Sequence, residues 1–170
     1  VSVQPSEKSL GRCEKYGAIM IHRRGCEMTR DWGVKIDHIG IAAIDLDASE
    51  QFWNLLGLIP ELGDEVIEDQ QVRVRMLPLE SDGGRAARIE LIKSTSPDGP
   101  IARFIKKRGV GIQQICLRIN DLDALLDHLD EHDVRLIDRK PRTGAEGQRI
   151  AFVHPSSTGG VLVELTEDAT

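Results

Sequence analysis

HIGIAAIDLDA at residues 38–48 and QICLRINDLDA at residues 114–124 are two versions of one stretch, and this repeat decides the fold. The copies lie at a constant offset of 76 residues, and the tetrapeptide DLDA is identical in both. Each copy is an apolar run of strand length, followed by an aspartate and then by a helical pattern. One such unit cannot bury the face of its sheet alone, so we expect the two halves to pack or curl around one another.

The aspartate of each copy is placed to begin a helix. Asp45 and Asp121 can accept hydrogen bonds from the unpaired amides of the first turn. After Asp121, four leucines recur at the spacing of one buried helix face: Leu122, Leu125, Leu126 and Leu129. After Asp45, the residues that we expect to form the buried face are Phe52, Leu55 and Leu56.

Strand-like segments follow each predicted helix. In the first half they are residues 65–69, 71–77 and 87–92, and in the second half 134–137, 149–153 and 160–165. Between the halves, residues 97–109 predict a short connecting helix with basic residues in its last turn. The sequence therefore predicts an α+β fold of two tandem βαβββ modules, at about 35–93 and 111–166.

The chain has 170 residues, which favours one domain. Residues 1–34 show no sustained period, so we expect a poorly ordered extension before a domain at 35–168. Three cysteines do not make a disulfide framework, and a zinc site from Cys13, His22 and Cys26 is disfavoured because no CxxC pair is present.

Composition excludes several classes of function. Lys and Arg total 22 against 28 Asp and Glu, and this net charge of −6 disfavours a nucleic-acid binder. Aromatic residues make up 4%, too few for base-stacking platforms. No apolar run is long enough to cross a membrane, and the N-terminus does not resemble a secretory signal. We expect a cytoplasmic protein that contacts neither nucleic acid nor membrane.

The repeat also pairs the residues that carry chemistry. His38 corresponds to Gln114, and Glu90 corresponds to Glu164 on the last strand of the other half. Taken alone, the histidine can be explained by hydrogen bonds within the core, and each glutamate by a strand alternation that turns it to solvent. Together, two carboxylates, an imidazole and an amide oxygen at matched positions predict a site for a divalent ion: Co, Mn, Ni or Mg.

Two basic features are candidates for binding an anion. Arg73 and Arg75 share one face of a predicted strand, and a solvated face explains them better than a substrate anion. The Gly-rich, basic loop 140–149 could hold phosphate, but it lacks a Walker spacing.

At this point the sequence resembles the vicinal oxygen chelate (glyoxalase/bleomycin resistance/dioxygenase) superfamily, and within it the methylmalonyl-CoA epimerase branch. The resemblance covers about residues 35–168. It rests on DHIGIA (37–42), IELI (89–92), TSPDGPIARFIKKRG (95–109) and above all PRTGAEGQRIAFVHPSSTGGVLVEL (141–165).

The resemblance implies a cupped mixed sheet around a central divalent metal, and interconversion of 2R- and 2S-methylmalonyl-CoA by proton transfer through an enolate. His38, Glu90 and Glu164 match the family's ligand positions, and Gln114 aligns with a ligating histidine. Glu164 is the expected catalytic base. An acyl-CoA thioester is the implied substrate, and a homodimer the implied assembly.

The sequence departs from the family pattern at the second base. The family's glutamate falls at Val74, or at Arg73 if the alignment slips by one residue. Neither can abstract a proton, so Glu65, Glu68 or a bound water are left as candidates. Two other functions stay open: a glyoxalase-type lyase acting on a thiol adduct, and a non-catalytic binding protein whose site has degraded. An extradiol dioxygenase is disfavoured, because it requires two histidines and one carboxylate.

Overall fold

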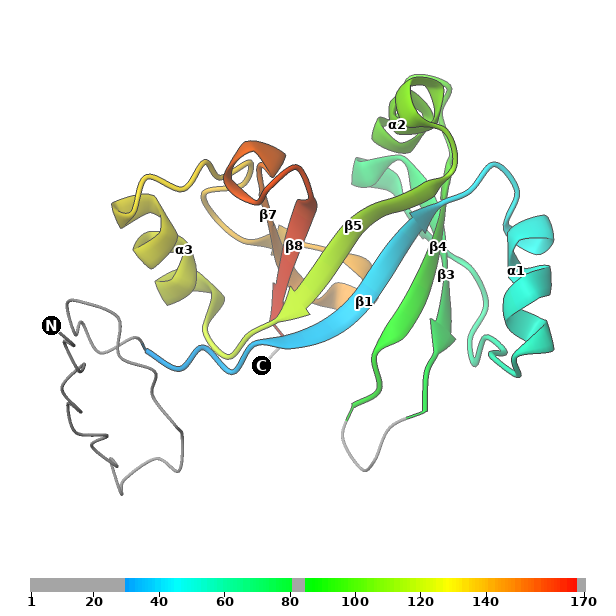
Figure 1. The fold of residues 1–170 in the computed structure, drawn as a ribbon, viewed down its shortest axis with the longest axis horizontal. Helices are drawn as coiled ribbons and strands as arrows, with labels where there is room; N and C mark the ends of the chain where they lie inside the picture. The colour runs from blue at the N-terminus through cyan, green and yellow to red at the C-terminus, as the bar shows by residue number, and fades with distance from the viewer. Residues whose placement is uncertain (1–29, 81–84, 168–170) are drawn as a thin grey trace, which may run out of the picture. The chain divides into compact units, whose positions relative to one another are not determined.

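The predicted duplication is visible in the backbone of the chain, for which a computed structural model describes residues 30–80 and 85–167 (Figure 1). Residues from Asp31 onward belong to one compact unit. Most of the predicted extension, including Cys13, His22 and Cys26, lies outside the described residues. The domain limits 35 and 168 therefore stay a prediction.

Each half contributes one helix and four strands. The first contains β1 (Lys35–Ala42), α1 (Leu46–Leu55), β2 (Glu65–Ile67), η1 (Glu68–Gln70), β3 (Val72–Pro78) and β4 (Arg88–Ser94). Helix α2 (Pro100–Arg108) connects the halves. The second contains β5 (Gly111–Arg118), α3 (Leu122–Glu131), β6 (Arg142–Thr143), η2 (Ala145–Gly147), β7 (Arg149–Val153), η3 (Pro155–Ser157) and β8 (Leu162–Glu167).

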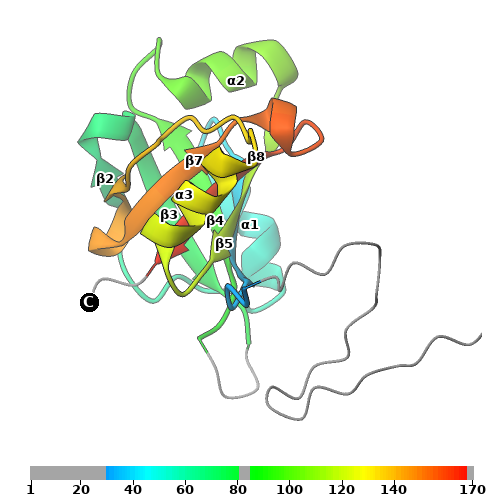
Figure 2. The ribbon, with the colours of Figure 1, turned by 90° about the vertical axis from the view of Figure 1, so that its left-hand side faces the viewer.

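All eight strands form one mixed, curved sheet in the order β2-β3-β4-β1-β5-β8-β7-β6 (Figure 1). The first strand of each half lies at the centre, where β1 and β5 are antiparallel. Each is parallel to the last strand of its own half, β1 to β4 and β5 to β8. Figure 2 shows α3 in front of β7 and β8, which it contacts. The predicted α+β fold is confirmed.

Both predicted helix starts are confirmed. A carboxylate oxygen of Asp45 accepts from the amide of Ala48 at 2.9 Å, and that of Asp121 accepts from Ala124 at 3.1 Å. The leucines of α3 face the sheet, three of them buried and Leu129 packed against the same core. No helix within the described ranges is long and apolar enough to cross a membrane.

The predicted buried face of α1 is wrong. Leu55 is 87% exposed, and Phe52 and Leu56 are each 59% exposed. The helix instead packs through Leu46 and Trp53, which are two turns apart and contact the outer face of the sheet. Apolar residues occur on both faces of this helix, so their spacing alone does not show which face is buried.

The predicted strand at 134–137 is also wrong. Leu136 makes one isolated bridge with Val153, and the first strand after α3 is instead β6. The amides of Ile137 and Asp138 both point to the same carbonyl, that of Phe152, so the segment cannot continue a regular ladder.

Strand alternation decides which residues face the inside of the curved sheet. On β4, Ile89 and Leu91 pack outward near α1, and Glu90 between them points inward. On β8, Leu165 packs outward against the core beneath α3, and Glu164 points inward. The two glutamates therefore enter the concave side from matched strands.

Candidate metal centre

The four residues that the repeat paired lie on four neighbouring strands. Glu90 is on β4, His38 on β1, Gln114 on β5 and Glu164 on β8, and these strands are consecutive in the sheet. Pairing places Gly40 of β1 opposite both Glu90 and Gln114. The sheet register thus brings all four predicted side chains to one place.

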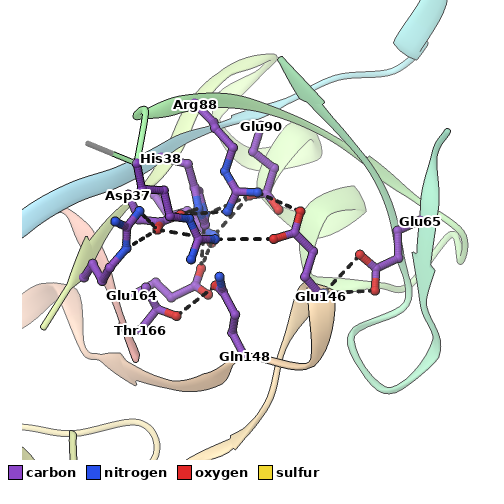
Figure 3. Close-up of polar contacts among 12 residues, drawn as sticks. Asp37, His38, Glu65, Arg88, Glu90, Glu146, Gln148, Glu164 and Thr166 are labelled. Atoms are coloured by element: carbon purple, nitrogen blue, oxygen red, sulfur yellow. Dashed lines mark hydrogen bonds and ion pairs between the residues drawn. The ribbon is translucent and has the colours of Figure 1, made fainter. Parts of the chain in front are cut away.

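The four side chains converge at a buried point on the concave face, and Figure 3 labels three of them, His38, Glu90 and Glu164. The Nε2 atom of His38 lies 3.3 Å from Oε2 of Glu90 and 3.6 Å from Oε2 of Glu164. The amide Nε2 of Gln114 lies 3.4 Å and 2.5 Å from the same two oxygens. Each residue is at most 7% exposed. Two buried carboxylates so close together require a positive partner.

Gly40 provides the space for this convergence. A Cβ at this position would lie 2.7 Å from Cγ of Gln114, closer than real Cβ atoms come, and 3.2 Å from Oε2 of Glu90, which is a tight contact. Sequence reasoning did not single out this glycine, although it stands two residues after His38. Because Gly40 has no side chain, the side chains of Gln114 and Glu90 can lie over β1.

Burial and charge shift the titration of the centre. Burial works against the imidazolium of His38, but the charge of Glu90 and the hydrogen bond with Asp37 raise the pKa of His38 well above its usual value. Burial likewise raises the pKa of the Glu164 carboxyl, against the opposing effect of His38. A proton on His38 neutralises part of the negative charge of Glu90 and Glu164. A bound metal cation can supply this positive charge instead.

The residues present fit a divalent metal. Nε2 of His38 is buried, points at two carboxylates and has no hydrogen-bond partner among the described residues. Such an orphaned nitrogen is the atom with which a histidine ligates a metal. The donor set of one nitrogen and three oxygens suits Mn, Mg, Co or Ni, provided that Gln114 presents its amide oxygen.

A second grouping of potential ligands lies on the other side of the imidazole. Ligand atoms of Asp37, His38 and Cys116 lie within 4.8 Å of one another, and all three residues are buried. Burial raises the pKa of the Cys116 thiol to about 12, which disfavours the thiolate that a metal requires.

The four side chains open into a cavity of about 350 Å³. One wall is apolar and includes Val72, Val74 and Ile92. Polar residues on the rest of the lining include Arg88, Gln113, Arg142 and Gln148. The guanidinium of Arg142 lies over the ring of Phe152 at 5.2 Å. The loop 140–149 therefore contributes a cation to the cavity.

The two glutamates predicted as substitutes for the second base do not line this cavity. Glu65 is paired with Val74 but lines a separate, smaller cavity of about 160 Å³, and its carboxylate accepts from the amide of Glu146 at 3.2 Å. Glu68 begins η1 and lines neither cavity.

Arg73 and Arg75 point away from the cavity. The guanidinium of Arg75 is bound by acidic residues on the outer face: Asp47 at 2.9 Å, Asp64 at 2.6 Å and Glu50. Arg73 is exposed on the same side of β3. This favours the solvated-face interpretation of this pair over binding of a substrate anion.

Comparison with known proteins identifies the family. Residues 37–152 match the family model of the glyoxalase/bleomycin resistance protein/dioxygenase superfamily. The chain belongs to this superfamily. The fold class expected from the resemblance, two modules in one curved sheet, is the architecture described above.

Three similar proteins share 36–40% of their residues with this chain. An uncharacterized protein of Bacillus subtilis, YqjC, is 40% identical over 78% of this chain and 91% of its own length. The structure of a methylmalonyl-CoA epimerase from Mycobacterium tuberculosis is 40% identical with a TM-score of 0.71, covering 79% of this chain and 88% of that one. A methylmalonyl-CoA epimerase in complex with methylmalonyl-CoA and ammonium is 36% identical with a TM-score of 0.75, covering 81% and 96%.

Proposed function

We propose that this protein is a methylmalonyl-CoA epimerase, which interconverts the 2R and 2S epimers by moving the α-proton through an enolate. The observation that carries the proposal is the buried set of His38, Glu90, Gln114 and Glu164 at the base of a cavity with one apolar wall. Superfamily relatives that share the fold at 36–40% identity are named for this activity.

His38, Glu90, Gln114 and Glu164 would hold the metal, which is Co, Mn, Ni or Mg. When bound, the metal supplies positive charge that stabilises the oxygen of the developing enolate. The amide of Gln114 presently points its nitrogen at Glu164, so ligation requires the amide to turn its oxygen inward. An amide oxygen is a weaker donor than the imidazole that relatives carry there, and we expect a correspondingly weaker site.

Epimerisation needs a proton-transfer group on each face of the planar intermediate. Glu164 is the proposed base, and burial raises the pKa of its carboxyl, which makes the carboxylate a stronger proton acceptor. Among the described carboxylates, Glu90 is the one that shares both the cavity and the symmetry-matched position with Glu164. We assign it the opposite face, in place of the glutamate that the family carries where this chain has Val74.

The substrate is an acyl-CoA thioester. The apolar wall at Val72, Val74 and Ile92 suits the methyl group, and Arg142 offers a cation for the malonyl carboxylate. Arg142 keeps two acidic neighbours, Asp69 at 3.2 Å and Asp138 at 3.4 Å, which orient it at the cavity. A protein with net charge −6 can thus present a local positive group to an anionic substrate.

A substrate comparison separates this function from its two rivals. With Co, Mn or Ni added, we expect the protein to convert 2R- into 2S-methylmalonyl-CoA and to leave the hemithioacetal of glutathione and methylglyoxal unchanged. Turnover of the hemithioacetal alone would instead identify a glyoxalase-type lyase. Binding of the CoA ester without turnover of either substrate would identify a binding protein.

We also propose that the protein is a homodimer. The support is an apolar surface on α1 and the segment after it that nothing in the described part of the chain covers: Phe52, Leu55, Leu56, Ile59 and Leu62. Exposed apolar residues gathered on one helix and the segment after it are typical of association sites, and a self-complementary surface closes a twofold dimer. A reducing compartment such as the cytoplasm suits the buried free thiol of Cys116.

Replacing Leu55 by glutamate is expected to convert the dimer into a monomer, since its side chain is 87% exposed within one copy and the change leaves the core intact. Sedimentation equilibrium of the wild type and the variant measures this. Lys35→Glu, an exposed change on β1 away from the patch, is the control. A monomeric wild type, or a variant that stays dimeric, contradicts the proposal.

A further inference from the structure

A buried carboxylate stands directly behind the metal-facing histidine. Asp37 is fully buried, with 0% of its surface exposed, and its Oδ1 lies 3.0 Å from Nδ1 of His38 (Figure 3). The two ring nitrogens of His38 therefore face opposite environments. Nδ1 contacts Asp37, and Nε2 points to Glu90 and Glu164.

Two arginines hold this carboxylate from neighbouring strands. Arg88 of β4 donates to Oδ1 of Asp37 at 2.9 Å. Arg118 of β5 donates to Oδ2 through Nε at 2.9 Å and through its terminal nitrogen as well. Both oxygens of Asp37 thus accept hydrogen bonds from guanidinium groups, and Oδ1 also faces Nδ1 of His38 as an acceptor.

This arrangement exists in one half of the repeat only. At the offset of 76 residues, the position of Asp37 is taken by Gln113. The amide oxygen of Gln113 is buried with no hydrogen-bond partner among the described residues, and it lines the cavity. The half that retains an imidazole therefore also has the carboxylate behind it, and the half with Gln114 has none.

We propose that Asp37 is a positioning residue for the metal centre: it fixes the proton of His38 on Nδ1 and the plane of the ring, so that Nε2 is presented to the ion. The inference rests on the proposed metal site. A histidine that ligates a metal commonly donates its other N–H to a carboxylate, which sets the tautomer and strengthens the ligand. Arg88 and Arg118 keep Asp37 in place and satisfy its remaining lone pairs.

The competing arrangement would place the ion between Asp37, Nδ1 of His38 and Cys116. It is disfavoured because both oxygens of Asp37 already accept from arginines. An ion there would also sit beside the two guanidinium groups, and the orphaned Nε2 would stay unsatisfied.

The first test detects the proton itself. In metal-free wild-type protein labelled with 15N-histidine, we expect a downfield Nδ1–H signal of His38 that is protected from exchange with solvent. His132, whose Nδ1 lies 2.8 Å from the carbonyl of His128 on the surface, is an internal reference. Absence of a protected Nδ1–H signal from His38 in the wild type overturns the proposal without any variant.

The second test is Asp37→Asn. Asparagine keeps the shape, but its amide hydrogens must face either Arg118 or the pair of Arg88 and His38, all of them donors. We expect the Nδ1–H signal to lose protection and the affinity for Co²⁺, measured by calorimetry, to fall about 10–100-fold. A purely structural role would lower the melting temperature and leave both of these readouts unchanged.

Cys116→Ala is the matched control, because it alters the same neighbourhood and leaves Asp37 intact. We expect its Co²⁺ affinity to stay within about threefold of the wild type, a change under 1 kcal/mol. An affinity loss equal to that of Asp37→Asn places the ion on the cysteine side and overturns the proposal. If the wild type binds no Co²⁺, the metal site fails, and the Nδ1–H signal still decides whether Asp37 positions the ring.

Discussion

Replacing Glu164 by glutamine is expected to lower turnover of methylmalonyl-CoA by about 10²–10⁴-fold, the usual contribution of a general base. Glutamine has nearly the same shape and can still offer an oxygen to a metal, but it cannot accept the α-proton. The carboxyl lies at the base of the cavity, 6% exposed, where no bulk water can substitute for it. Steady-state kinetics with each epimer measures the effect.

Glu167→Gln is the control for this substitution. Glu167 is on the same strand, three residues on, and binds Arg149 at 2.6 Å on the other face of the sheet. We expect its turnover to stay within about threefold of the wild type, since Glu167 does not line the cavity. A Glu164→Gln protein within threefold of the wild type would rule out Glu164 as the base.

Replacing Glu90 by glutamine is expected to uncouple proton exchange from inversion. If Glu164 and Glu90 serve opposite faces, the variant keeps one working base. One epimer should then exchange its α-proton with solvent deuterium but not invert, and exchange from the other epimer should fall at least about 100-fold. Proton NMR of each pure epimer in D₂O reports exchange and inversion separately.

The mirror-image result is expected for Glu164→Gln, which makes the two variants controls for each other. If both variants slow exchange equally for both epimers, Glu90 does not act as an acid or base and serves only in binding. Introducing a carboxylate with Val74→Glu in the Glu90→Gln background then tests the position where the family resemblance expects the second base.

The position of the centre could be predicted from the sequence because the repeat ties the residues together. His38 and Gln114 lie 76 residues apart and Glu90 and Glu164 lie 74 apart, so each pair takes equivalent positions in the two halves, whatever the exact strand ends are. The capping aspartates were equally predictable, because a helix start depends on residues within one turn. Their roles at the metal stay a proposal.

Other features depend on contacts that no local pattern contains. The face that α1 buries is decided by Leu46 and Trp53 meeting the sheet, although Leu55 and Phe52 are as apolar. The role of Asp37 depends on arginines 51 and 81 residues away along the chain. That Glu65 lines a different cavity from the four site residues depends on how the strands fold around both cavities.

Solvent deuterium exchange at the α-carbon of methylmalonyl-CoA tests the central claim most directly, because it detects proton abstraction whichever residue performs it. With the wild-type protein and added Co²⁺ or Mn²⁺, we expect deuterium to enter both epimers as they interconvert. After removal of the metal by a chelator, the rate should fall at least about 100-fold and recover when metal is returned. A metal-loaded protein that binds the CoA ester and exchanges no α-proton would contradict the account.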